Sequence, residues 1–437
     1  MDATAPTSAG LGLLEQLKAR LSSSEFIGRH RRDERCFTRK RHLTFAVVIL
    51  FLLNLLKRAL QDELDEFFKV LNGETMAVRQ VTKSAFSQAR QKLKYEAFVE
   101  LNREQVAYFY GHFGPQTWQG FRLLAIDGST LELPNTQNVI EHFGVWHSGN
   151  GEGCPLARVS HMFDVLNHVT VDAKIAPKSV GERELAAGHC AHLQPGDLLL
   201  TDRNYPAFWL FALILSREAD FCARMSIGIW NVVDEFVASG LPEQIVSLSP
   251  CPGAIRECRA RGLPTDPIRV RLIRVELSTG EIEVLATSLL DSLRYPVSIF
   301  KDLYHHRWPV EEDYKAMKCR IEVENFTGTS VLAVYQDFHA KVFTMNLTAI
   351  LALPAQKVVQ QQSQGKQYVY QVNMANAFSK MKDTVVLLLQ QVNPLPLLQR
   401  LWQLMIQTIE PVRPGRSYPR KKRVKPRRFP MAYKPLR

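Results

Sequence analysis

Two aspartates in the middle of this 437-residue sequence stand in similar contexts that suit catalytic carboxylates. Asp127 follows the apolar run LLAI and precedes Gly128 and Ser129, so we expect it at the end of a strand beside a tight turn. Asp202 follows the run LLLT in the same way. Because ligands gather at the carboxyl ends of strands in open α/β sheets, these two carboxylates are candidates for a common site.

A third acid lies in the segment YHHRWPVEEDYKAMK. At 100° per residue, Tyr304, Arg307, Glu311 and Lys318 share one face of a helix. An acid flanked by cations suits a metal ligand surrounded by phosphate-binding groups, since arginine grips phosphate with two donors and lysine acts as a point charge. The alternative is an ordinary ion pair between Arg307 and Glu311, with Lys318 in solvent.

Pro309 limits this helical argument, because it lacks an amide donor and disfavours helical geometry at Trp308. The helix therefore either begins near Pro309 or is kinked there. In both cases the shared face holds strictly only from Glu311 to Lys318. The neighbouring Glu312 points about 100° away from Glu311 and is the acid most easily confused with it.

Carboxylates of this kind are what phosphodiester transfer requires. The reaction needs an activated water or 3′-hydroxyl and a stabilised leaving oxygen, and two divalent metal ions can serve both purposes. Mg²⁺ prefers carboxylate oxygens as ligands. Convergence of Asp127, Asp202 and Glu311 would therefore predict a magnesium-dependent centre.

Other candidate residues suit structural roles better. Three residues with loose zinc-ligand spacing, His189, Cys190 and His192, fall on an expected surface helix without a second ligand pair, so we do not expect zinc. Trp230 fits the core better than a base-stacking role. Packing or hydrogen bonding is the expected role of His161, Asp164, His305 and His306.

The elements that must position the acids change in character near Phe121. Residues before it are expected to be mainly helical, whereas Arg122 to Ser226 gives the order β-β-β-α-β-α-β, which is that of a ribonuclease H-like mixed sheet. Residues 226–291 indicate a β-rich insertion that includes a hairpin at STGEIEVL. Helices are expected to resume over 297–317, 331–353 and 375–409, with a linker at the Gln run VQQQSQ. The fold class is therefore α/β.

One expected helix in the amino-terminal region, residues 81–93, has a polar and basic face that includes Lys83, Ser87 and Arg90. Thr82 or Ser84 can cap its first amides. Such a face suits a recognition helix against a DNA groove, although many basic amphipathic helices are only solvated.

The net charge of +12 is concentrated at the carboxyl end, because residues 411–437 carry eleven lysine or arginine residues and no acid. A basic tail indicates a polyanionic partner, of which nucleic acid is the commonest, or a solvated tail without a specific task. Seven cysteines without CxxC spacing favour a reducing, cytoplasmic compartment. The apolar run from Leu43 to Leu56 is too short to span a bilayer, so we expect a buried helix there and no membrane partner.

Taken together, the motifs resemble a known family. The pattern of Tyr304, Arg307, Glu311 and Lys318 is similar to the Y-R-E-K signature of the insertion sequence four (IS-four) family of DDE transposases. The contexts AIDGS and LLLTDRNY resemble that family's first and second catalytic aspartates, and ENFTG resembles the segment after its signature helix. The resemblance covers roughly residues 29–353.

The resemblance implies that Asp127, Asp202 and Glu311 bind two Mg²⁺ ions, which Mn²⁺ can replace. It implies that Tyr304, Arg307 and Lys318 hold transposon-end phosphates. Arg203 and Tyr205 resemble supporting residues, and we expect Arg203 to contact DNA.

The implied organisation has five parts. Residues 1–118 would form a helical domain that binds transposon ends, 119–225 and 292–355 the two parts of the catalytic core, 226–291 the β-rich insertion, and 356–437 a helical region with the basic tail.

The implied protein is a nucleoid-associated bacterial transposase that acts as a homodimer on transposon ends and target DNA, by strand cleavage and strand transfer. Two alternatives stay open. One is a metal-dependent nuclease without strand transfer, and the other is a non-catalytic DNA-binding descendant. The intact set of three acids argues against the second.

Overall fold

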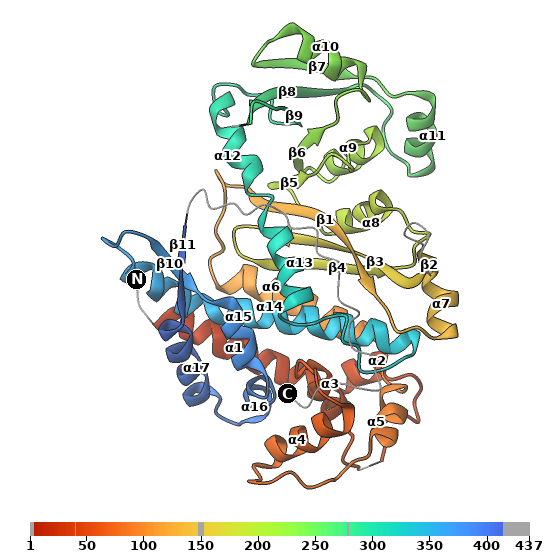
Figure 1. Ribbon diagram of the computed structural model, residues 1–437, viewed down its shortest axis with the longest axis vertical. Helices are drawn as coiled ribbons and strands as arrows, with labels where there is room; N and C mark the ends of the chain where they lie inside the picture. The colour runs from red at the N-terminus through yellow and green to blue at the C-terminus, as the bar shows by residue number, and fades with distance from the viewer. Residues whose placement is uncertain (1–3, 40, 147–152, 278, 414–437) are drawn as a thin grey trace. The chain divides into compact units, whose positions relative to one another are not determined.

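The computed structural model describes residues 4–39, 41–146, 153–277 and 279–413, and the chain divides into two compact units (Figure 1). Unit 1 consists of Met1–Gly114, Glu132–Pro155 and Lys315–Arg437. Unit 2 consists of Pro115–Leu131 and Leu156–Tyr314. The two aspartates and the expected catalytic glutamate all belong to unit 2.

Unit 2 is built on a mixed sheet in which the strand order is β4-β3-β1-β5-β6-β9-β8-β7. Strands β1, β5 and β6 are parallel to one another, whereas the pairs β3/β4, β6/β9, β8/β9 and β7/β8 are antiparallel. The strands are β1 (Arg122–Glu132), β3 (Cys154–Asp164), β4 (Val169–Ala176), β5 (Asp197–Thr201), β6 (Asp220–Met225), β7 (Glu243–Leu248), β8 (Ile268–Glu276) and β9 (Ile282–Thr287).

The central strands of this sheet contain continuous apolar runs, which is the pattern of strands buried on both faces. The side chains from Leu123 to Ile126 on β1 and from Leu198 to Leu200 on β5 are fully buried. Helices α8 (Glu182–His189) and α9 (Phe208–Leu215) lie between successive strands of the chain. The expected alternation of strands and helices after Arg122 is therefore present, with α7 and β2 added between β1 and β3.

The segment 226–291 differs from the expected β-rich insertion. It contains α10 (Asn231–Ser239) and α11 (Pro252–Ala260) as well as β7, β8 and β9. The three strands extend the sheet itself, because β9 pairs with β6 (Figure 1). The hairpin expected at STGEIEVL is found as the antiparallel pair β8/β9. The short helices were missed because nine residues give little periodic signal.

The helix expected over residues 297–317 is interrupted. Its parts are a 3₁₀ turn (Val297–Ile299), α12 (Phe300–His305) and α13 (Pro309–Cys319). Proline at the first position of α13 starts the helix, since its missing amide donor is not needed there. The single helical face therefore does not extend back to Tyr304 and Arg307.

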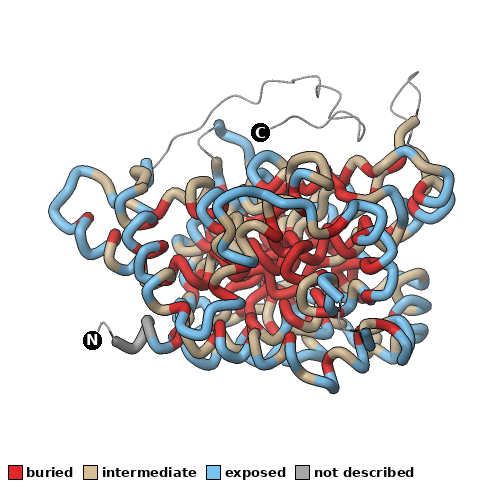
Figure 2. Tube along the Cα trace, turned by 90° about the horizontal axis from the view of Figure 1, so that it is seen from below, coloured by how far each residue is buried: buried red, intermediate tan, exposed pale blue. Residues whose placement is uncertain are grey.

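Unit 1 is mainly helical. Its central helix is α14 (Val331–Gln362), which packs against α3 (Phe45–Leu53), α6 (Glu96–His112) and α17 (Leu395–Gln407). The buried parts of the chain, red in Figure 2, are surrounded by exposed segments. The remaining elements are α1 (Thr4–Ser22), α2 (Ser24–His30), α4 (Leu60–Asn72), α5 (Lys83–Arg90), α7 (Gln137–Phe143), β2 (Val145–Trp146), β10 (Val369–Val372), α15 (Met374–Met381), α16 (Thr384–Gln390) and β11 (Ile409–Val412).

Three expectations for unit 1 have clear outcomes. The apolar run after Leu43 is the buried helix α3, as expected. The Gln run is not a linker, because α14 continues through Gln362. The helical stretch expected over 375–409 is divided into α15, α16 and α17, with Asp383 at a φ of 62° between the first two.

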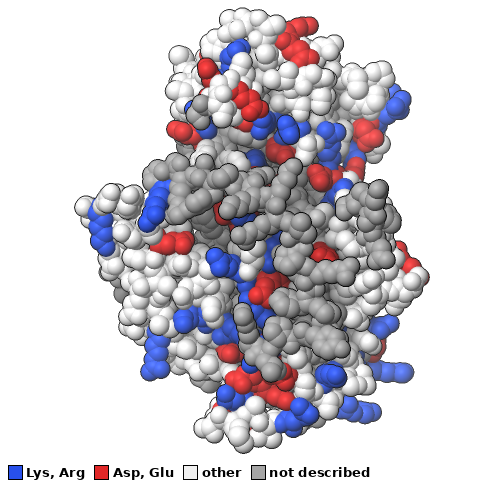
Figure 3. Space-filling model, viewed as in Figure 1, with Lys and Arg blue, Asp and Glu red and all other residues white. Residues whose placement is uncertain are grey.

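Among the described residues, α14 is the one helix long and apolar enough to cross a membrane, and 67% of its most apolar window is buried within the protein. Such burial is the pattern of a core helix. No disulfide joins any of the seven cysteines, all of which the structure describes. The basic tail lies outside the described residues after Arg413. On the face drawn in Figure 3, basic and acidic side chains are interspersed.

Candidate active site

Asp127 lies inside β1, not at its end as expected, because the strand continues through Gly128 to Glu132. The parallel pairing of β1 with β5, however, ends one residue earlier, at Ile126 and Thr201. Asp127 and Asp202 are thus the residues that directly follow the last paired residues of the two strands. Both aspartates therefore lie where the parallel pairing stops, as the sequence predicted, although Asp127 is inside a strand and not at its end.

The environment of Asp127 disfavours its charged form. The pKa of Asp127 is raised to about 6, mainly by burial and also by the nearby Asp202 and Glu311, against the opposing effects of the Gly128 amide and Arg307. The Gly128 amide donates to Asp127 Oδ1 at 2.8 Å. Crowding of carboxylates in a poorly hydrated place is typical of sites that bind cations.

Asp202 directly follows β5, as expected. Its Oδ1 accepts a hydrogen bond from the Asn204 amide at 2.9 Å, and its carbonyl accepts one from the Tyr205 amide at 3.2 Å. These bonds form a tight turn after the strand, and this turn fixes the direction of the Asp202 side chain.

Arg307 lies between the acids. Its Nη2 is 2.6 Å from Glu311 Oε1, and its Nη1 is 3.6 Å from Asp127 Oδ2. The residue is only 8% exposed, and its Nε has no hydrogen-bond partner among the described residues. The ion pair that we considered as an alternative role for Arg307 is therefore present, but it lies within the acid cluster and not in solvent.

Tyr304 precedes the break between α12 and α13. Its hydroxyl donates to the carbonyl of Thr201, the last residue of β5, at 3.4 Å. Burial raises its pKa above the ordinary value, so the phenol stays protonated. The break brings Tyr304 and Arg307 to the end of β5 and β1 without requiring one continuous helix.

A cleft of about 630 Å³ opens beside Asp202. Its lining includes four cations, Arg203, Arg224, Lys301 and Arg307, together with the indole of Trp308, which is 44% exposed. A cleft with clustered cations and an exposed aromatic ring suits a nucleic-acid strand, because cations bind phosphates and a ring can stack on a base.

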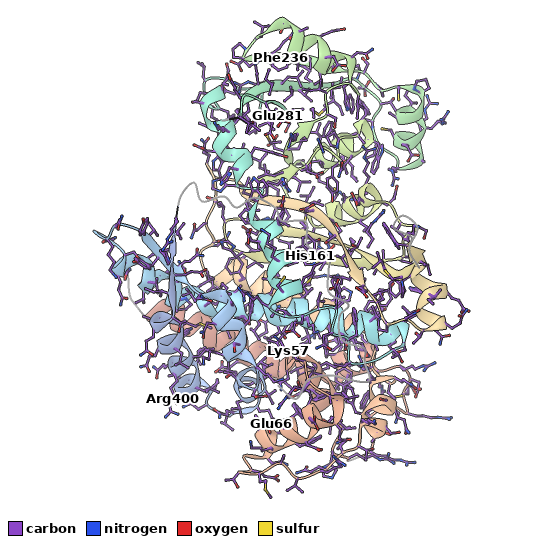
Figure 4. The ribbon with its side chains drawn as sticks, in the orientation of Figure 1. Lys57, Glu66, His161, Phe236, Glu281 and Arg400 are labelled. Carbon is purple, nitrogen blue, oxygen red and sulfur yellow. The ribbon has the colours of Figure 1, made fainter. Side chains whose placement is uncertain are left out.

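A second layer of hydrogen bonds supports the backbone of Asp127. Tyr314 Oη donates to the Asp127 carbonyl at 2.9 Å, and Tyr314 stacks on His161 with ring centroids 4.6 Å apart. His161, on β3 and labelled in Figure 4, is 2.9 Å from Asp313 Oδ2 through its Nδ1. His161 therefore has the hydrogen-bonding role expected from the sequence.

His189 is also part of this layer and is fully buried, not on a surface helix as expected. Its Nδ1 lies 2.7 Å from Asp172 Oδ2, and its Nε2 lies 3.0 Å from Ser160 Oγ. Ser160 Oγ in turn donates to the Asp127 carbonyl at 3.4 Å. Both ring nitrogens of His189 therefore have side-chain partners within the protein.

The acids have the carboxylate groups that a divalent-metal site needs, but in this structure they are not close enough together to hold one ion. Among the described residues, no three His, Cys, Asp or Glu side chains stand close enough together to hold one metal ion. Asp127 and Asp202 nevertheless supply the oxygen donors that Mg²⁺ prefers, and the Arg307 guanidinium occupies a cationic position between Asp127 and Glu311. The donor set therefore fits a divalent cation.

The other expected DNA contacts have different placements. Arg203 is exposed and lines the cleft, while Lys318 is partly exposed near the end of α13, after the chain has passed into unit 1. Lys83 and Ser87 are exposed on α5, but Arg90 is 5% exposed. Because Arg90 bonds to Asp337, Thr327 and Gln336, the expectation that it contacts DNA is wrong.

Comparison with known proteins identifies the family. The family model described as "Transposase DDE domain" matches residues 118–347, which include all three acids. The chain belongs to this family. The match covers more than half of the sequence and leaves α5 outside it.

Two transposases of Escherichia coli (strain K12) are similar to this DDE transposase family member. "Transposase InsG for insertion sequence element IS4" is 26% identical over 250 residues, which are 56% of this chain and 55% of that protein. "Putative transposase InsZ" is 26% identical over 166 residues, which are 37% of this chain and 54% of that protein. The chain therefore spans about half the length of these curated relatives. These matches confirm the expected kinship with IS-four DDE transposases.

A solved structure, "Cryo-EM structure of piggyBac transposase synaptic complex with hairpin DNA (SNHP)", is also similar, with a TM-score of 0.44 and 9% sequence identity over 92% of this chain and 87% of that one.

Several residues of this DDE domain were missed by the sequence analysis. Arg224 on β6, Lys301 on α12 and Trp308 line the cleft, but the sequence gives no pattern that joins them. Trp308 carries the clearest signal, since it lies between Arg307 and Pro309 in the signature segment.

Proposed function

We propose that this protein is a DNA transposase in which Asp127, Asp202 and Glu311 form a metal-dependent DDE centre. One observation carries the proposal. Within the segment that matches the transposase DDE domain, Asp127 and Asp202 directly follow the last paired residues of the adjacent parallel strands β1 and β5, and Arg307 links Asp127 to Glu311. The strand order β4-β3-β1-β5-β6 further supports a ribonuclease H-like core.

In the proposed reaction, a water oxygen attacks phosphorus at the transposon end, and the bond to the 3′-oxygen breaks to leave a 3′-hydroxyl. That hydroxyl then attacks a phosphorus of target DNA and displaces the target's 3′-oxygen. Two Mg²⁺ ions, or Mn²⁺ in their place, would activate the nucleophile and stabilise the leaving oxygen. The carboxylates of Asp127, Asp202 and Glu311 would hold these ions.

The cations would bind the DNA backbone. Arg307 Nε has no hydrogen-bond partner in the part of the chain that the structure describes, and the guanidinium already lies beside two of the acids, so it can turn toward a phosphate that enters with metal. Tyr304 would position the same strand. Lys318 and Arg203 would bind phosphates along it, and the cleft cations Arg224 and Lys301 extend this set.

The remaining parts of the proposal concern the whole protein. Residues 1–118 would recognise transposon ends through the exposed face of α5, including Lys83 and Ser87. A homodimer would pair two ends, as strand joining at two ends requires, and the protein would act in the bacterial cytoplasm at the nucleoid. The five-part division given by the sequence stays a proposal for how these tasks are distributed.

The test is to incubate purified protein with end DNA of its element, Mg²⁺ and a target plasmid, and to score nicking and joining separately. Wild type should yield both products, and Glu311→Gln neither, while Glu312→Gln is the matched control because it alters the adjacent exposed carboxylate. Nicking without joining would favour the nuclease. Binding without cleavage by wild type, in Mg²⁺ and in Mn²⁺, would favour the non-catalytic descendant.

A further inference from the structure

Tyr205 is a buried residue of the acid cluster that the proposed reaction does not use. Its side chain is only 1% exposed, yet its hydroxyl has no hydrogen-bond partner among the described residues. Buried polar groups almost always have a partner, because an unsatisfied hydroxyl costs free energy. An exception in a functional site indicates a ligand that is present only when the site is loaded.

The hydroxyl faces a small space beside the catalytic strand. A Cβ atom built on Gly128 would lie 3.4 Å from Tyr205 Oη and 3.6 Å from Glu182 Cδ. Because Gly128 has no side chain, this position is left open directly after Asp127. Tyr205 also follows Asp202 by three residues within the same turn. Asp202 is therefore close to the phenol along the chain, and Asp127 is close to it in space through Gly128.

The charges around the phenol keep it a donor. Burial raises the pKa of Tyr205 well above its ordinary value, and the carboxylates of Asp127, Glu182 and Asp202 raise it further, against Arg307. The phenol is protonated at any pH at which the protein works. It therefore has one O–H to donate and, in this structure, no acceptor among the described residues.

We propose that the Tyr205 hydroxyl donates a hydrogen bond to an oxygen atom that enters the Asp127–Asp202 site with its ligand. The inference rests on the proposed function for the identity of that ligand. The acceptor is either a water oxygen held by the metal ion or a non-bridging oxygen of the DNA phosphate. Both present a negatively polarised oxygen to a neutral donor among carboxylates.

The first variant is Tyr205→Phe, compared with Tyr314→Phe in the same site. Tyr314 donates to the Asp127 carbonyl at 2.9 Å, so its loss should lower the melting temperature. Loss of the unpartnered Tyr205 hydroxyl should leave the melting temperature of the metal-free protein unchanged or raise it. A fall equal to that of Tyr314→Phe would mean that the hydroxyl has a partner within the protein, and would overturn the proposal.

Two further measurements identify the acceptor. Calorimetric titration of DNA-free protein with Mn²⁺ should show roughly tenfold weaker binding in Tyr205→Phe if the acceptor is a metal-held water. Unchanged Mn²⁺ affinity with a roughly tenfold slower single-turnover cleavage of end DNA assigns the phosphate oxygen. If neither quantity changes, the proposal is wrong. Tyr295→Phe, buried beside Trp118 and away from the acids, is the control that should change neither.

Gly128→Ala tests the same space independently. The added methyl would make ordinary van der Waals contacts with Tyr205 and Glu182, so the fold should be retained while the space is filled. We expect Gly128→Ala to lower the same quantity as Tyr205→Phe, either the Mn²⁺ affinity or the rate of end-DNA cleavage. Full activity and full Mn²⁺ affinity would contradict the proposal. If wild type cleaves no DNA, the transposase proposal fails, but the melting and Mn²⁺ measurements still test Tyr205.

Discussion

At the scale of single residues, Arg307 has two roles that compete for the same guanidinium. It neutralises Glu311 and approaches Asp127 in the DNA-free protein, and it is the proposed ligand of a DNA phosphate. A metal ion that enters the site meets this cation between two of its carboxylate ligands. Metal binding and phosphate binding should therefore assist each other, since the phosphate draws Arg307 away from the acids.

This competition predicts the effect of Arg307→Gln. The DNA-free variant should bind Mn²⁺ about tenfold more tightly than wild type, which corresponds to about 1.4 kcal/mol and is a modest fraction of the repulsion between two charges in a partly buried site. Cleavage of end DNA should fall, because the phosphate ligand is lost. Calorimetric titration and a cleavage assay measure the two effects.

Arg224→Gln is the matched control for this substitution. Arg224 lines the same cleft but pairs with Glu283 at 2.8 Å, not with the acids of the site. It should leave the Mn²⁺ affinity unchanged. Weaker Mn²⁺ binding by Arg307→Gln would show that the guanidinium organises the carboxylates and does not compete with the metal.

At the scale of elements, α5 has one buried and one exposed face, and the two faces have separable roles. Arg90 on the buried face bonds to Asp337 at 2.8 Å and to Gln336 at 2.9 Å, both on α14. Lys83 and Ser87 lie on the exposed face. The buried arginine holds the helix in place, and the exposed side chains are available to DNA.

We therefore expect opposite results from two substitutions in α5. Arg90→Met should lower the free energy of unfolding by roughly 3–5 kcal/mol, because it leaves the buried Asp337 carboxylate without its cation. Lys83→Gln should leave stability within about 0.5 kcal/mol and weaken binding of end DNA. Denaturant unfolding and fluorescence anisotropy measure these effects, and equal loss of stability in both variants would refute the division of the two faces.

The stability that helix α4 gains from Glu63 depends on pH. Glu63 is buried and forms an ion pair with Lys382 at 2.7 Å. Burial alone raises the pKa of Glu63, but Lys382 and the amides of Arg58 and Lys57 outweigh it and lower the pKa below 4.5. The unfolded chain binds this proton more readily than the folded one. The stabilisation is therefore complete above pH 4.5 and is lost as the pH falls through the lower folded-state pKa.

Glu63→Gln should accordingly cost about 3 kcal/mol of unfolding free energy at pH 7, since Lys382 loses a buried partner, and the deficit should shrink below pH 4.5. Urea unfolding at a series of pH values measures it. Glu66→Gln on the same helix is the control, because the Glu66–Lys69 pair is partly exposed and should contribute less than about 0.5 kcal/mol at any pH. A deficit independent of pH would show that packing, and not charge, is responsible.

Features of these elements that depend on neighbouring residues in the sequence were predicted, whereas features that depend on contacts between distant residues were not. Asp202 after β5 and the start of α13 at Pro309 follow from local rules of strand ends and proline geometry. The burial of Arg90 and His189 depends on α14 and on Asp172, which no local pattern connects to them. The cleft residues Arg224 and Lys301 were missed for the same reason, since β6 and α12 both line the cleft only in the folded protein.

At the scale of the whole molecule, charge is distributed very unevenly along the chain. The net charge is +12, and residues 414–437 contain ten lysine or arginine residues without an acid. The rest of the chain is therefore nearly neutral, and basic and acidic side chains are interspersed on the face in Figure 3. Sequence-independent affinity for DNA should then come mainly from the tail, while the cleft and α5 position the DNA on the protein.

Truncation after Arg413 tests this division of labour. Each phosphate neutralised by a basic side chain contributes about 0.9 to the slope of log affinity against log salt concentration. If the tail engages even three phosphates, its removal should reduce that slope by roughly 3 and weaken binding most at low salt. Lys83→Gln, which removes one cation, should reduce the slope by about 1 at most. An unchanged slope in the truncated protein, with an unchanged melting temperature, would mean that the tail does not touch DNA and that the nearly neutral remainder binds it through specific contacts alone.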